Sequence, residues 1–165
     1  MKKYILVTIV ILSLSCVNLF AEKVVVGFAD FQTSNPNPVY TYKTTGVAAF
    51  GLASTEGYSG FVKRLELPSG QSIKKVKAYI KHNSSKRISI ALGYSDVTSG
   101  VITIIASKNL ITSFGSDDVK EIVLDINMPD HVVNNKKYEY ALGISFDDGG
   151  DDGNLMFYGA KIKLK

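Results

Sequence analysis

Residues 75–81 (KVKAYIK) and 88–94 (ISIALGY) decide the fold, because apolar and polar side chains alternate along both stretches. In the first stretch, Val76, Ala78 and Ile80 occupy every second position. The positions between and around them carry three lysines and a tyrosine. In the second stretch, every second residue is Ile, Leu or Tyr. A period of two is that of a β-strand with one buried face. Each stretch therefore predicts a half-buried strand.

The same alternation, or a β-prone composition, recurs along the rest of the chain. Further strands are predicted at 23–28, 39–43, 61–67, 101–107, 119–126, 138–146 and 156–165. Clusters of Gly, Pro, Asn, Asp and Ser separate them as turns, and the Gly-rich stretch 46–60 predicts a strand with a loop. Eight to ten short strands without intervening helices predict an all-β fold, namely an antiparallel β-sandwich of jelly-roll type.

The N-terminus has the composition of an export signal. Two lysines at positions 2 and 3 precede an apolar run that is too short to span a bilayer comfortably. Cleavage after Ala21 gives a signal peptide of residues 1–21 and a single domain of residues 22–165. Alternatively, residues 13–16 (SLSC) resemble a relaxed bacterial lipobox, which would end the signal at residue 15 and make Cys16 a lipidated first residue. The sequence thus predicts a periplasmic, outer-surface or secreted protein.

Charge and cysteine content narrow the class of protein. Two of the 19 Lys and Arg lie in the signal, so 17 basic residues face 15 acidic ones and the net charge is +2. No Arg-rich segment is present to follow a phosphate backbone, so nucleic acid is not expected as a partner. Cys16 is the only cysteine, which excludes an intramolecular disulfide. We therefore expect an extensive apolar core to stabilise the exported domain.

A set of strand and turn motifs carries a resemblance to a known group. The motifs are LPSG at 67–70, Ile73 with VKAY at 76–79, Asn83 with ISIAL at 88–92, YEY at 138–140 and YGAKI at 158–162. Together they resemble a loose group of exported bacterial β-sandwich proteins of uncharacterised function. The resemblance covers residues from about 60 to the C-terminus. It implies a jelly-roll-like sandwich and a non-enzymatic protein, and it brings no catalytic residues.

Two groups of residues are candidates for binding. The lysines of two predicted strands each share one face and would suit anionic glycans or lipid head groups if the strands are neighbours; they are Lys75, Lys77, Lys81, Lys161, Lys163 and Lys165. Asp-rich residues between two other strands supply the oxygen ligands that calcium prefers, although the spacing is not that of an EF-hand; they are Asp147, Asp148, Asp151, Asp152 and Asn154. A plain solvent-exposed hairpin and a plain solvated face are the alternatives.

The strand Val24-Val25-Val26 is a third feature of interest, because an uncharged β-prone strand is hazardous as an open edge. It is expected to pair within its own sandwich or, alternatively, with a second copy of the chain as a homo-oligomer.

Catalytic signatures are not evident. The two histidines stand beside turns and far apart in sequence, which favours structural roles. We therefore predict a non-catalytic module of the cell envelope or secreted fraction that binds a glycan or protein or acts as a structural subunit. The alternative is a small secreted glycan-active hydrolase, and it requires acidic residues such as Asp117, Asp118, Glu121 or Asp125 to meet in a concave site.

Overall fold

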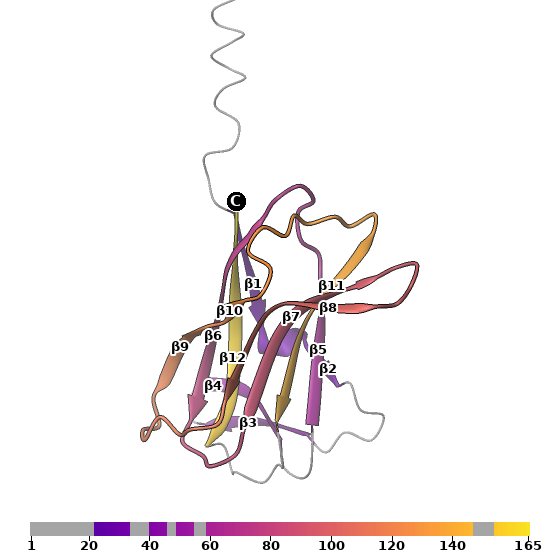
Figure 1. The fold of residues 1–165 in the computed structure, drawn as a ribbon. Helices are drawn as coiled ribbons and strands as arrows, with labels where there is room; N and C mark the ends of the chain where they lie inside the picture. The colour runs from indigo at the N-terminus through magenta and orange to yellow at the C-terminus, as the bar shows by residue number, and fades with distance from the viewer. Residues whose placement is uncertain (1–21, 34–39, 46–48, 55–58, 147–153) are drawn as a thin grey trace, which may run out of the picture.

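The protein is a sandwich of two antiparallel β-sheets in the computed structural model, which describes residues 22–33, 40–45, 49–54, 59–146 and 154–165 (Figure 1). Its elements in chain order are β1 (Lys23–Gly27), the 3-10 turn η1 (Phe28–Asp30), β2 (Gln32–Thr33), β3 (Tyr40–Thr45), β4 (Ala49–Ser54), β5 (Ser59–Leu65), β6 (Ile73–His82), β7 (Ile88–Asp96), β8 (Ile102–Leu110), β9 (Val119–Val123), β10 (Asp125–Ile126), β11 (Tyr138–Phe146) and β12 (Leu155–Leu164).

Each sheet has six strands. Sheet A has the order β3-β4-β12-β6-β9, and β1 also pairs with β12. Sheet B has the order β10-β8-β7-β11-β5-β2. Two strands have only two residues, and the other ten have at least five. The predicted all-β antiparallel sandwich is therefore confirmed, and its ten longer strands agree with the eight to ten expected.

The core lies between the two sheets and is built from the apolar positions of the alternating strands. Val76 and Ile80 of β6 in sheet A, and Leu92 of β7 and Leu142 of β11 in sheet B, are fully buried members of one apolar cluster. Edge-on aromatic contacts add to the core. The ring centres are 5.4 Å apart in the pair Phe31 and Phe157, and 5.9 Å apart in the pair Phe61 and Phe146. Burying one such large side chain stabilises the fold by roughly 1.5–3 kcal/mol.

The stretch 119–126, predicted as one strand, is two strands in different sheets. β9 pairs with β6 in sheet A, whereas β10 pairs with β8 in sheet B. Leu124 stands between them, only 1% exposed, and its N–H donates to the carbonyl oxygen of Val76 at 3.0 Å. The chain therefore crosses from one sheet to the other at a buried leucine, and the single-strand prediction is wrong at this residue.

The N-terminal strand pairs within its own sandwich. β1 lies antiparallel to β12 with Val24 opposite Ile162 and Val26 opposite Ala160. Val26 is buried at 2% exposure and Val25 points outward at 67%.

In the part of the chain that the structure describes, no helix has the length and hydropathy needed to cross a membrane.

Candidate binding surfaces

The two predicted lysine ladders lie side by side on the outer face of sheet A. β6 and β12 are hydrogen-bonded neighbours, with Lys77 directly opposite Lys161 and Lys75 directly opposite Lys163. On the other side of β12, Lys23 of β1 is opposite Lys163. The condition attached to the sequence prediction, that the ladders be adjacent, is therefore met.

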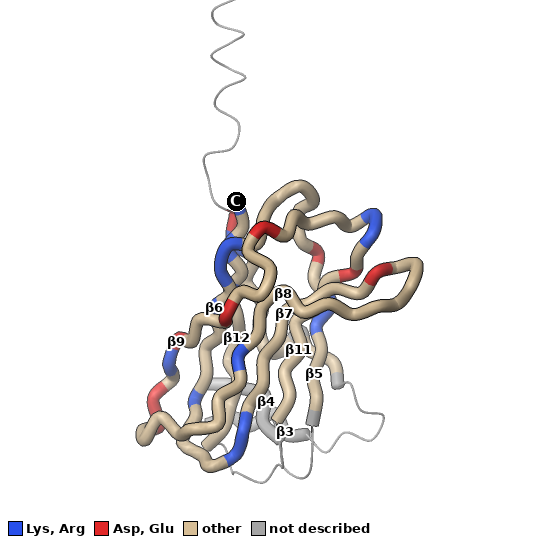
Figure 2. The backbone as a smooth tube through the Cα atoms, in the orientation of Figure 1, with Lys and Arg blue, Asp and Glu red and all other residues tan. Residues whose placement is uncertain are grey.

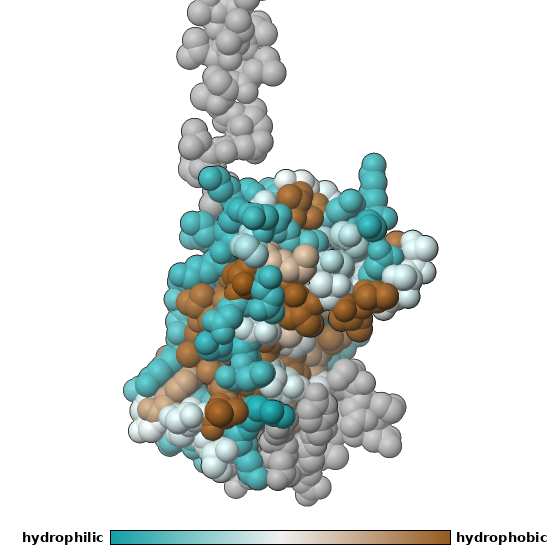
Figure 3. All heavy atoms as spheres, viewed as in Figure 1, coloured by the Kyte–Doolittle hydropathy of each residue, from teal (hydrophilic) through white to brown (hydrophobic). Residues whose placement is uncertain are grey.

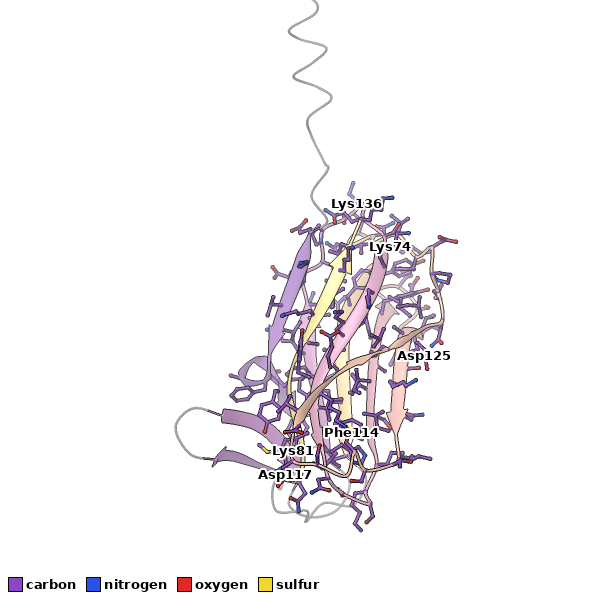
Figure 4. The ribbon with its side chains drawn as sticks, turned by 90° about the vertical axis from the view of Figure 1, so that its left-hand side faces the viewer. Lys74, Lys81, Phe114, Asp117, Asp125 and Lys136 are labelled. Carbon is purple, nitrogen blue, oxygen red and sulfur yellow. The ribbon has the colours of Figure 1, made fainter. Side chains whose placement is uncertain are left out.

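These lysines line a hollow of about 490 Å³, which we call groove A. Its floor spans β1, β12, β6 and β9, the strands that face the viewer in Figure 4. Most of its lining is basic, and the residues are Lys23, Val25, Lys75, Lys77, Tyr79, Glu121, Lys161 and Lys163.

One acidic residue stands in groove A, and it is fully engaged. A carboxylate oxygen of Glu121 forms an ion pair with Lys77 Nζ, and the other oxygen accepts a hydrogen bond of 3.1 Å from the Tyr79 hydroxyl. The hydrogen bond between the two charged groups raises the pKa of Lys77 and lowers the pKa of Glu121. Lys161 Nζ lies 5.0 Å from the centre of the Tyr79 ring, within the range of a cation–π contact.

Two of the six lysines singled out from the sequence lie outside groove A. Lys81 stands toward the far end of β6 and forms an ion pair of 3.0 Å with Asp117. Figure 4 shows these two residues close together. Lys165 follows the last residue of β12. Lys23, which the sequence did not indicate, takes a place in the groove because β1 pairs with β12.

A second hollow, of about 360 Å³, lies on the outer face of sheet B, and we call it groove B. Its floor consists of small residues on the two central strands, Ala91 and Gly93 of β7 and Ala141 and Gly143 of β11. The rest of its lining is largely apolar, with Ser95 and one charged pair, and comprises Val62, Arg64, Tyr94, Ser95, Ile102, Ile104, Glu139 and Tyr140. Figure 3 shows hydrophobic side chains exposed beside the β7–β8 hairpin.

The two glycines in the floor of groove B have different causes. A Cβ on Gly93 would lie 2.7 Å from the carbonyl oxygen of Thr103, so close approach of β8 requires glycine there. A Cβ on Gly143 would meet nothing nearer than 3.9 Å. Packing therefore does not require glycine at 143, and its absent side chain keeps the groove open.

Sequence reasoning missed groove B, although a signal was present. The outward positions of β7 and β11 carry small residues in succession, although β-strands are generally poor in Gly and Ala. Both strands are uncharged except near their ends (Figure 2). The outward residues are Ser89, Ala91, Gly93 and Ser95 on β7, and Ala141, Gly143 and Ser145 on β11.

The acidic residues that a hydrolase would need are held by different lysines. Asp117 pairs with Lys81 and Glu121 pairs with Lys77 on sheet A, while Asp125 pairs with Lys108 at 3.0 Å on sheet B. Figure 4 shows Asp125 well away from Asp117. Three of the four carboxylates singled out thus lie in separate ion pairs.

The histidines lie in separate structural settings. His82 is fully buried at the end of β6, with its Nε2 3.3 Å from the carbonyl oxygen of Leu110. The His131 ring stacks on Tyr94 with centres 4.8 Å apart, and its Nε2 lies 2.9 Å from the Tyr140 hydroxyl. Burial lowers the pKa of His131. Both rings thus form part of the packing.

The predicted calcium ligands cannot be compared as a set. Asp147, Asp148, Asp151 and Asp152 lie outside the described residues, as does Cys16. Asn154 is described, and its carbonyl oxygen accepts a hydrogen bond of 2.7 Å from the N–H of Asn83. Among the described residues, no group of three or more His, Cys, Asp or Glu side chains is placed to hold a metal ion.

No protein-family model matches the chain, and no curated protein matches it by sequence. Solved structures do match the fold. The C-terminal CBM6 of a laminarinase from Zobellia galactanivorans is 10% identical with a TM-score of 0.57, over 86% of this chain and 99% of that one. A xylan-binding module CBM15 is 11% identical with a TM-score of 0.51, over 88% and 97%.

A third similar structure is part of an enzyme chain. The CBM22-1–GH10 segment of a Clostridium thermocellum xylanase, in complex with xylohexaose, is 18% identical with a TM-score of 0.53. The match covers 89% of this chain and 28% of that one. The fold is accordingly a β-sandwich like that of these carbohydrate-binding modules, and the predicted jelly-roll-like class is confirmed.

Proposed function

We propose that this protein is a non-catalytic glycan-binding module and that groove B holds a neutral glycan. The observation that carries the proposal is the open floor at Gly143, where the structure has room for a side chain and the sequence supplies none. A depression on the face of a sheet, with an apolar lining and few polar groups, is a typical site for a small ligand.

The lining of groove B matches the chemistry of a sugar. Val62, Ile102 and Ile104 are 40%, 73% and 41% exposed and offer apolar contacts to the C–H faces of a pyranose ring. Arg64 and Glu139 form an ion pair of 2.9 Å at one side and supply donors and acceptors for hydroxyl groups. The opposite charges of this pair favour an uncharged ligand. The similar structures include a xylan-binding module and a module of a laminarinase, which supports a glycan.

The alternative function, a small glycan-active hydrolase, finds less support. Glycoside hydrolysis generally uses two carboxyl groups facing each other across the scissile bond. Of the residues singled out for that role, only Glu121 lines either groove, and it is paired with Lys77.

The proposal is tested by filling the groove. Gly143→Leu places a side chain over the floor, and its backbone is in an ordinary strand conformation. Ser145→Leu is the matched control, because Ser145 faces the same way two residues along β11 but does not line groove B. We expect isothermal titration with xylan, β-1,3-glucan and galactan oligosaccharides to detect binding to at least one. Gly143→Leu should weaken that binding at least tenfold, roughly 1.4 kcal/mol.

Ser145→Leu should bind like the unmodified protein. If Gly143→Leu and Ser145→Leu bind the glycan with equal affinity, groove B is not the site. Failure of the unmodified protein to bind any neutral glycan of the panel would count against the function itself.

We also propose that the protein acts outside the cytoplasm, on the basis of the signal-like residues 1–21. The intact mass of the exported form should correspond to a chain that begins at residue 22 or at a lipidated Cys16. Recovery of the full chain from a cytoplasmic fraction would contradict this localisation.

Calcium binding by the Asp-rich residues between β11 and β12 stays a prediction from sequence. Weak binding, of roughly 10⁻⁴ to 10⁻³ M, would be typical of an extracellular module. Calorimetric titration with calcium, and melting curves in calcium and in chelator, measure it directly. The absence of heat and of any melting shift at several millimolar calcium would leave a plain hairpin.

A further inference from the structure

We infer that groove A is a second binding site, for an acidic polysaccharide whose repeating units carry carboxylate or sulfate groups. The inference does not rest on the proposed function, because groove A lies on the opposite sheet and shares no lining residue with groove B. It rests on the positions of the lysines, their lack of counter-charges and the shape of the hollow.

The lysines stand where like charges repel most strongly within a sheet. Lys77 with Lys161, and Lys75 with Lys163, are directly opposed across β6 and β12. Directly opposed like charges destabilise a pair of strands. Lysines are often placed on a sheet edge to prevent aggregation. That explanation does not fit here, because β6 lies between β12 and β9, and β12 lies between β6 and β1.

Most of the positive charge in groove A is not neutralised by the residues that the structure describes. The lining holds five lysines and one glutamate, a net charge of +4. Lys77 is the only one of the five with an ion pair to an acidic residue in the described parts of the chain. A local charge of this size raises the concentration of anions in the groove.

The spacing of the lysines suits a polymer with several charges rather than a single small anion. Lysines two residues apart on one strand are separated by about 7 Å, and adjacent strands by about 4.8 Å. The three strands β1, β12 and β6 therefore present ammonium groups over a field roughly 10 Å wide. One phosphate or carboxylate could contact only part of it.

The residue types in groove A favour a polysaccharide over other polyanions. Among the described residues, the lining has no arginine, the residue that binds phosphate in a bidentate manner. Tyr79 is its single aromatic residue and is already covered by Lys161, which leaves no stacking platform for bases. Val25 is its one apolar side chain, whereas basic surfaces that bind membranes usually also insert apolar groups.

The test compares two variants of equal charge. The groove variant is Lys75→Gln, Lys161→Gln and Lys163→Gln, and the control variant is Lys63→Gln, Lys108→Gln and Lys136→Gln. The three control lysines lie on sheet B or the loop before β11, outside groove A. The probes are polygalacturonate, heparin, neutral dextran, phosphatidylglycerol vesicles and single-stranded DNA, each measured by titration in 50 and 200 mM salt.

We expect the unmodified protein to bind polygalacturonate or heparin and not dextran. The groove variant should lose at least tenfold in affinity and show a flatter salt dependence, because fewer counterions are released. The control variant should change less than threefold. Both variants should retain cooperative melting and the neutral-glycan binding of groove B, so this result is separable from that of the proposed function.

Three outcomes would overturn the inference. Equal losses by the two variants would mean that net charge alone causes binding. Tighter binding to vesicles or to DNA than to both acidic polysaccharides would assign the surface to a membrane or a nucleic acid instead. The absence of binding to every polyanion at 50 mM salt would leave groove A as a solvated face.

Discussion

The outer faces of the two sheets use the same alternation of strand residues to opposite effect. On sheet A, the outward positions of β6 and β12 carry long basic side chains, which form the walls of groove A. On sheet B, the outward positions of β7 and β11 carry small residues, and groove B is open because side chains are absent. One groove therefore depends on charge and the other on shape. They should therefore respond to different substitutions.

The largest effect on stability is expected where shape depends on the backbone. Gly93→Ala places a Cβ 2.7 Å from the carbonyl oxygen of Thr103, at the irregular pairing between β7 and β8. Such overpacking typically destabilises a protein by about 1–3 kcal/mol. Gly143→Ala on the same floor meets only ordinary contacts, so its change should stay within about 0.5 kcal/mol.

Urea unfolding of the two alanine variants measures this difference. A similar loss of stability in both would mean that the floor of groove B is fixed by packing throughout. The interpretation of Gly143 as an open position would then be wrong.

A smaller effect is expected where charge decides. Glu121→Gln removes the one acidic residue among the described residues that line groove A, and it releases Lys77 from its ion pair. Affinity for an acidic polysaccharide should rise about twofold to fivefold, the size typical of exposed charge interactions. Glu139→Gln, on groove B, is the matched control and should leave that affinity unchanged. A decrease in Glu121→Gln would indicate that Glu121 holds Lys77 and Tyr79 in the binding geometry.

Much of this architecture could be predicted from sequence because strand alternation is a local signal. The stretches 75–81 and 88–94 lie within β6 and β7, and 138–146 matches β11. The prediction of one strand at 119–126 is wrong because a β-prone run does not reveal which sheet each of its halves joins. Only the partners of β9 and β10 separate them, and both partners are distant in sequence.

The grooves show the same limit at the level of side chains. The lysine ladders were visible in the sequence, but their adjacency depends on the register of β6 against β12, which joins residues about eighty positions apart. Lys23 could not be included before β1 was known to pair with β12. Groove B was not predicted because small residues such as Gly and Ala do not form a recognisable binding motif in a sequence. Its four floor residues become a site only when β7 and β11 lie side by side.

The smallest expected effect is a dependence of stability on pH, which should involve the side of groove B and not groove A. His131 stacks on Tyr94 and contacts Tyr140, both of which line groove B, and burial lowers its pKa. The unfolded chain therefore binds a proton more readily than the folded one. The stability contributed by neutral His131 is complete above the ordinary histidine pKa of about 6.5 and is lost as the pH falls from there toward the lowered value. Thermal melting should shift down modestly between pH 7 and pH 5, and His131→Gln should reduce that shift. Polyanion binding by groove A should not weaken over this window, because lysines stay charged. An unchanged shift in His131→Gln would show that other groups cause it.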